Sequence, residues 1–288
     1  MLNDDMLHRL DALRLAMQSY VRGGAGGVRK SRALGDSAEF SDFREYAPGD
    51  DLRRIDWNAY ARFDRLFLKL FMEEQEMHLT LILDASASMG FGEPSKWAFA
   101  VDAALMLAYL AVSGGDRVSI VALNGEKVLR SPTYAGRQGY VQALAFLQDI
   151  QPSGETKLTK AVTRIPLKAA RGMCALISDL FSEDGSEGAF NSLQYRKQQV
   201  VLAQVLSKEE MEPELNGSLR LIDSEGGPAM DVTVNGELLR RYHKNLESFI
   251  GGARAYCHRH GMPYVLLRSD MDLMHDALGN FMRGGIIA

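Results

Sequence analysis

The sequence predicts an α/β fold with three layers, in which helices cover both faces of a mostly parallel, doubly wound sheet. The first observation is a series of short runs that are apolar almost throughout, as strands are when both faces of their sheet are covered. The second is that helical patterns separate these runs, which is the order of elements that a parallel sheet requires. The expected strands lie at residues 78–84, 117–123, 174–181, 199–206 and 263–269.

The expected helices are set by apolar spacing and by capping residues. Apolar side chains spaced four, three and four residues apart, starting at Met6, predict an amphipathic helix over residues 4–20. Ser95 is a suitable N-cap for a helix over residues 95–113, which two glycines end. Residues 217–235 are predicted to form a hairpin with a Gly-Gly turn. Further helices are expected at residues 139–148, 158–170, 238–260 and 271–282.

Residues 1–76 are predicted to form an N-terminal helix and an accessory segment, and residues 77–288 the main domain. From residue 30 onward the accessory segment alternates arginine, aspartate and aromatic residues, with a strand expected at 65–71. Its charges of both signs argue against a phosphate-binding stripe. An ion-pair network that packs the segment on the main domain is favoured, and a docking surface for a partner is the alternative.

Charge and cysteine content exclude several classes of protein. With 33 basic and 37 acidic side chains the chain has a formal net charge of -4, so we expect no nucleic-acid partner. Two cysteines, Cys174 and Cys257, are too few for a disulfide framework and fit a reducing compartment. The first residues lack the pattern of a secretory signal, and the longest apolar run, 103–112, is about half the length that spans a bilayer. We therefore expect a cytoplasmic protein without membrane insertion.

The most informative stretch is the D-x-S-x-S sequence that directly follows the first expected strand. It places Asp84, Ser86 and Ser88 in a tight loop beyond the carboxyl end of that strand, where open α/β sheets bind their ligands. A carboxylate and two hydroxyls are hard oxygen donors, which suit Mg²⁺ or Mn²⁺ and do not suit zinc or copper. A strand-ending turn with helix-capping hydroxyls is the alternative interpretation.

Two further loops are expected at the same edge of the sheet. Thr156 lies in a loop before the helix expected at 158–170, and Asp179 ends the strand expected at 174–181. Each has a simpler explanation, Thr156 as a helix N-cap and Asp179 as a turn residue. Together the three loops supply oxygen donors for one hard cation: Asp84, Ser86, Ser88, Thr156 and Asp179.

This set resembles the metal-ion-dependent adhesion site of von Willebrand factor type A (vWA) domains, in which D-x-S-x-S is followed by a threonine and then an aspartate. The resemblance implies that Ser86 and Ser88 bind the metal directly, and Thr156 directly or through water. It implies that Asp84 and Asp179 act mainly through bridging waters. Such a site leaves one coordination position open, which a carboxylate of a partner protein completes.

The accessory segment carries a second resemblance, in the sequence PGDDLRRIDW over residues 48–57 and in the E-F, R-E-Y and A-R elements that flank it. These are similar to the bacterial family called domain of unknown function 58. Members often accompany MoxR-type AAA+ ATPases, so the resemblance implies such an ATPase, or its client protein, as a partner. Many members begin with two transmembrane helices, which this sequence does not show, and we expect it to belong to the soluble branch.

The predicted function is a metal-dependent protein–protein interaction module that works with a MoxR-type AAA+ ATPase on a client complex, and not an enzyme. A divalent-metal phosphoester hydrolase is the alternative, but that chemistry requires more direct carboxylate ligands and a positioned base. A structural subunit with an empty metal site is the third interpretation. The glycine-rich stretch at 23–27 lacks the context of a phosphate-binding loop, and residues 257–260 (CHRH) lack a second ligand pair for zinc.

Overall fold

The computed structural model describes residues 4–11, 13, 39–48, 50–72, 77–125, 127–167, 172–222, 224 and 229–288. The chain forms two compact units. The large unit holds residues 1–17 and 77–288, and the small unit holds residues 18–76. The N-terminal helix, which was expected to accompany the accessory segment, therefore groups with the large unit.

A six-stranded sheet forms the centre of the large unit. Its strands are β3 (His78–Asp84), β4 (Arg117–Asn124), β5 (Lys127–Arg130), β6 (Gly172–Ser178), β7 (Gln198–Leu206) and β10 (Tyr264–Arg268). Their spatial order is β10-β7-β6-β3-β4-β5. Neighbours run parallel except β5, which pairs antiparallel with β4 at one edge. The mostly parallel α/β sheet predicted from the sequence is thus confirmed.

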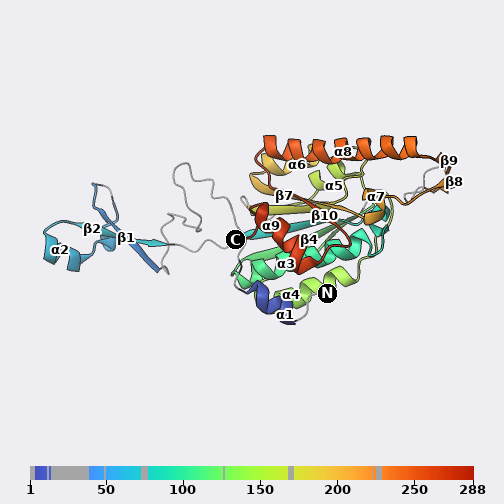
Figure 1. Cartoon of the computed structure of the whole chain (residues 1–288). Coiled ribbons are helices and arrows are strands. Elements are labelled where there is room, and N and C mark those ends of the chain that lie inside the picture. The colour runs from blue at the N-terminus through green and yellow to red at the C-terminus, as the bar shows by residue number, and fades with distance from the viewer. Residues whose placement is uncertain are drawn as a thin grey trace. The chain divides into compact units, whose positions relative to one another are not determined.

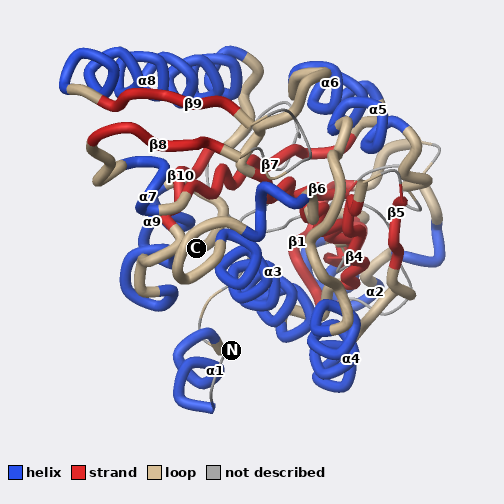
Figure 2. The backbone as a smooth tube through the Cα atoms, turned by 90° about the vertical axis from the view of Figure 1, so that its right-hand side faces the viewer, coloured by secondary structure: helices blue, strands red, loops and turns tan. Residues whose placement is uncertain are grey.

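Helices cover both faces of this sheet (Figures 1 and 2). One layer holds α5 (Leu158–Thr163), α6 (Glu187–Tyr195) and α8 (Gly236–Arg259). The other holds α1 (Asp4–Leu10), α3 (Lys96–Ser113), α4 (Gly136–Gln148) and α9 (Leu278–Arg283). Successive strand residues face opposite layers, so that Leu81 packs on the α3 side and Ile82 on the α5 side. The sheet therefore separates two apolar cores.

Helix α3 is the central helix of its layer. It begins after Ser95, whose hydroxyl accepts the backbone N–H of Ala98 as an N-cap, at the predicted position. Among the described helices it is the one long and apolar enough to cross a membrane, but 78% of it is buried inside the protein. It is the core helix of the large unit, and Lys96, its first residue, is fully buried.

Helix α1 is tied to this layer by packing and by one hydrogen bond. Leu10 is fully buried in the same core as α3, and Asp11 accepts the hydroxyl proton of Tyr109 (2.6 Å). The rest of the helix predicted over residues 4–20 lies outside the described residues.

Two other predicted helices differ from the structure at their ends. The helix expected over 158–170 ends at Thr163, because Pro166 lacks a backbone N–H and restricts the residue before it; residues 168–171 lie outside the described part. The helix expected over 271–282 begins as a π-helical turn, Leu273–Ala277, before α9. The predicted hairpin is present as the antiparallel pair β8 (Gly217–Leu221) and β9 (Met230–Val234).

The small unit contains one antiparallel strand pair and a short helix. Its elements are β1 (Glu39–Glu45), a 3-10 turn (Leu52–Arg54), α2 (Trp57–Phe63) and β2 (Phe67–Met72). Asp56 caps α2 by accepting backbone N–H groups. Ion pairs between Arg44 and Asp50 (2.7 Å) and between Arg65 and Glu45 (3.0 Å) join residues within this unit.

Both cysteines lie in the core of the large unit and should be chemically inert. Burial raises the pKa of the Cys174 thiol to about 12 and that of the Cys257 thiol to about 11. Since the thiolate is the reactive form, we expect neither to react with a disulfide reagent such as DTNB in the native protein at pH 8, and both to react after denaturation. One thiol titrating rapidly in the native protein would contradict the described core packing.

Candidate metal centre

Asp84 ends β3 and lies buried at the carboxyl edge of the sheet. One carboxylate oxygen accepts the hydroxyl proton of Ser178 at 2.7 Å, and the other accepts the backbone N–H of Ser86 at 3.0 Å. Ser178 ends β6, which pairs in parallel with β3, so the two strand ends lie side by side. Both oxygens of Asp84 are thereby held in place.

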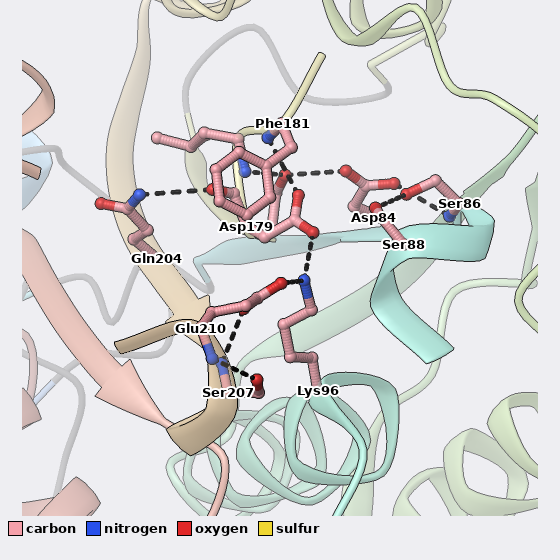
Figure 3. A network of polar contacts seen from close by, with 11 residues as sticks. Asp84, Ser86, Ser88, Lys96, Asp179, Phe181, Gln204, Ser207 and Glu210 are labelled. Carbon is pink, nitrogen blue, oxygen red and sulfur yellow. Dashed lines mark hydrogen bonds and ion pairs between the residues drawn. The ribbon is translucent and has the colours of Figure 1, made fainter. Parts of the chain in front are cut away.

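The hydroxyls of Ser86 and Ser88 point toward each other in the loop after β3 (Figure 3). Their oxygens are 3.0 Å apart; Ser86 is buried and Ser88 is half-buried. A 3-10 turn over Ala87–Gly90 begins directly after Ser86 and keeps Ser88 close to it. The structure thus brings the two predicted hydroxyl ligands together.

The loop that carries Thr156 packs against the Ser86 loop. The N–H of Ala87 donates to the carbonyl of Gly154 (2.8 Å), which joins the two loops. Thr156 is buried, and its hydroxyl donates to the carbonyl of Leu123 at the end of β4 (3.3 Å). Its oxygen lies at the predicted edge of the sheet and keeps lone pairs for a cation.

Asp179 is fully buried and lies between Asp84 and Lys96 (Figure 3). One carboxylate oxygen accepts a hydrogen bond from the ammonium group of Lys96 at 2.7 Å, and the other accepts the backbone N–H of Phe181 at 3.0 Å. The sequence predicts Asp179 at this edge, but the ion pair with Lys96 was not predicted.

Lys96 contacts a second carboxylate, that of Glu210, at 2.5 Å. Glu210 lies in the short helix α7 (Lys208–Met211), where it forms a capping box with Ser207 directly after β7. Strands β3, β6 and β7 therefore each lead to one carboxylate at the same edge. We call Asp84, Asp179, Glu210 and Lys96 the charge cluster.

The charge cluster has more negative than positive charge. In the described part of the chain, Lys96 supplies the one ammonium group in contact with this cluster, where it pairs with Asp179 and Glu210. Two negative charges therefore stay uncompensated when all three carboxylates are ionised. Burial, and to a lesser extent the negative charge of Asp179, raise the pKa of Asp84 to about 6. The hydrogen bonds from Ser178 and Ser86 act in the opposite direction and lower this pKa. Burial also raises the pKa of Glu210, against the opposing effect of Lys96.

These features fit a hard divalent cation. In an octahedral Mg²⁺ shell with metal–oxygen distances of about 2.1 Å, neighbouring ligand oxygens lie about 3.0 Å apart, which matches the separation of the Ser86 and Ser88 hydroxyls. A double positive charge also matches the excess negative charge of the cluster. Among the described residues, no group of three or more His, Cys, Asp and Glu side chains is placed to hold a metal. A cation here would therefore depend on hydroxyl oxygens.

The sequence analysis missed Lys96 and Glu210. Lys96 could have been identified, because a cation at the N-terminus of a mostly apolar helix opposes the helix dipole and needs a partner. Glu210 carried a weaker signal, the S-x-x-E capping-box pattern at 207–210. Neither pattern indicates that the two side chains meet, since they are 114 residues apart.

Comparison with known proteins places the chain in a family. A family model described as protein of unknown function DUF58 matches residues 42–248, which is most of the chain and includes every residue of the candidate metal centre. The chain belongs to this family. The resemblance noted in the accessory segment is confirmed, and the adhesion-type metal site remains a prediction.

Relatives of this DUF58 protein include two mycobacterial proteins. It is 26% identical over 274 residues to "Uncharacterized protein Rv1480" of Mycobacterium tuberculosis (strain ATCC 25618 / H37Rv). The aligned region covers 93% of this chain and 86% of the relative. The same values hold for "Uncharacterized protein Mb1516" of Mycobacterium bovis. The similarity therefore extends over both units.

Solved structures with a related arrangement include two proteins. The conserved hypothetical protein BatB from Bacteroides thetaiotaomicron has a TM-score of 0.41 at 19% identity, over 72% of this chain and 98% of BatB. The SpRpn10 VWA domain has a TM-score of 0.42 at 9% identity, over 71% of this chain and 94% of that domain. Neither likeness bears on metal binding or on partners.

The raised pKa of Asp84 predicts how the cation-free protein responds to pH. Between about pH 4 and pH 6 the folded chain holds a proton on Asp84 that the unfolded chain has released, so stability falls as pH rises through this window. The quantity to follow is the difference in the free energy of unfolding between the natural protein and the Asp84→Asn variant. This difference should shift by about 2–3 kcal/mol against the natural protein between pH 4 and pH 7. Urea unfolding in EDTA measures this, and a difference that stays constant with pH would contradict it.

Proposed function

We propose that this DUF58 protein is a protein-interaction module whose binding requires Mg²⁺ or Mn²⁺. Ser86 and Ser88 bind the cation, Thr156 contributes a third hydroxyl, and a carboxylate of the partner completes the shell. Neutral hydroxyl ligands leave the cation with most of its charge, so it attracts an acidic side chain. The observation that carries the proposal is the Ser86–Ser88 pair, two hydroxyl oxygens at ligand spacing beside buried, uncompensated carboxylates.

The hydrogen bonds of the centre favour binding over hydrolysis. A metal-dependent hydrolase requires direct carboxylate ligands and a base with a free oxygen. Both oxygens of Asp84 accept hydrogen bonds, and both oxygens of Asp179 are engaged, one by Lys96 and one by Phe181. These contacts hold both carboxylates in place within the centre, which favours binding over hydrolysis.

We propose a MoxR-type AAA+ ATPase, or the client of that ATPase, as the partner, in the cytoplasm. The choice of the ATPase rests on the frequent association of family members with MoxR-type ATPases. Two buried free thiols support a cytoplasmic location. The surface beside the centre offers apolar contacts, since Phe91 is 50% exposed after the Ser88 turn and Phe181 is 40% exposed after Asp179. A partner with an acidic residue next to an apolar one matches this surface.

The proposal predicts that partner capture depends on the cation and on the two serine hydroxyls. In a pull-down with a MoxR-type ATPase of the same organism, or with its client, capture should occur in millimolar Mg²⁺ and fall at least about tenfold in EDTA. The double variant Ser86→Ala/Ser88→Ala should lose capture to the same extent, because it removes the direct ligands and little volume.

Ser248→Ala is the matched control, since Ser248 is exposed on α8 and its hydroxyl bonds only within that helix, to the carbonyl of Lys244. This variant should capture the partner as the natural protein does. Circular dichroism should show the same helix content in all three proteins. Capture that persists unchanged in excess EDTA would count decisively against metal dependence.

A further inference from the structure

We infer that the ammonium group of Lys96 is a tethered cation that competes with the divalent metal for Asp179 and stabilises the protein when no metal is bound. That the competing ion is a divalent metal rests on the proposed function. Lys96 itself is never a metal ligand in this account; it is a positioning residue that sets how strongly the centre attracts a cation.

The location of Lys96 requires a specific electrostatic partner. Its side chain is fully buried, although it begins a mostly apolar helix whose N-terminus repels positive charge. An unpaired ammonium group in such a place is strongly disfavoured. Lys96 is therefore held by the carboxylates that surround it and by the ring of Phe181, whose centre lies 5.2 Å from the ammonium nitrogen.

The two carboxylates that hold Lys96 differ in what else they contact. Asp179 lies next to Asp84, which accepts the N–H of Ser86, so it faces the side of the candidate metal centre. Glu210 contacts the same ammonium group and is anchored in α7 by its capping box with Ser207. Lys96 can therefore release Asp179 to a bound metal and stay paired with Glu210.

Charge balance gives the direction of the effect. Without a metal, Lys96 is the positive charge in direct contact with Asp179, and it stabilises this buried carboxylate. With a metal bound, the ammonium and the dication repel each other across a short distance in a buried environment. Removal of the lysine charge should therefore strengthen metal binding and weaken the metal-free fold.

The test is Mn²⁺ affinity of the full chain, measured by electron paramagnetic resonance, together with the melting temperature in EDTA. Lys96→Met keeps the length and removes the charge. We expect Mn²⁺ to bind about tenfold more tightly or better. We also expect the melting temperature to fall in EDTA, where Asp179 and Glu210 lie unpaired, and to recover with Mn²⁺.

Lys208→Met is the matched control, because Lys208 is an exposed lysine of α7 two residues from Glu210. It should leave the Mn²⁺ affinity within about twofold of the natural value. Should Lys96→Met not fold, the charge-balanced variant Lys96→Met/Glu210→Gln replaces it. That variant removes the lysine and its second partner together and leaves Asp179 free, so it should also bind Mn²⁺ more tightly.

The outcomes separate this inference from the proposed function. If the natural protein binds no Mn²⁺ but the lysine variant does, metal dependence of the natural protein fails, while the lysine is established as a replacement for the metal. If both bind and the variant binds more tightly, both ideas stand. Equal affinity in the natural and lysine variants, or binding by neither, would overturn the inference.

Discussion

The ion pair between Lys96 and Asp179 is the interaction on which the described centre depends. Three parallel strands end at one edge of the sheet and each leads to a carboxylate, of Asp84, Asp179 or Glu210. Without a positive charge, three such groups could not all be ionised in so small a buried volume. Lys96 supplies one charge, and burial, together with the nearby charge of Asp179, raises the pKa of Asp84. The charge cluster therefore keeps a net negative charge when its carboxylates are ionised, and this charge attracts a further cation.

The fold explains why these groups meet. Parallel strands place their carboxyl ends at the same edge, so residues far apart in the chain become neighbours there. Helix α3 begins at that edge and brings Lys96 with it, while its apolar body is held between the sheet and the helices of its layer. The loop of Thr156 joins the arrangement through a backbone hydrogen bond to the Ser86 loop. The position of the centre is therefore a consequence of the sheet topology.

The sequence predicted the sheet well because its strands are covered on both faces and therefore appear as apolar runs. It predicted Asp84, Ser86 and Ser88 because a short local pattern defines their loop. Short elements were missed: β5 has four residues and is only partly buried, and α6 has nine residues. The pairing of Lys96 with Glu210 was missed because the two residues lie far apart in the sequence. A charged residue in an apolar segment indicates that it has an oppositely charged partner in the folded protein. The sequence alone does not identify that partner.

We propose that Ser86 and Ser88 hold a divalent cation beside this cluster. The most direct measurement is a crystal structure of the protein grown with Mn²⁺, with diffraction recorded at the manganese absorption edge. The expected result is an anomalous peak about 2.2 Å from the hydroxyl oxygens of both serines, with Asp179 nearby. A map with no peak at this position, and with the two hydroxyls still bonded to each other, would contradict it.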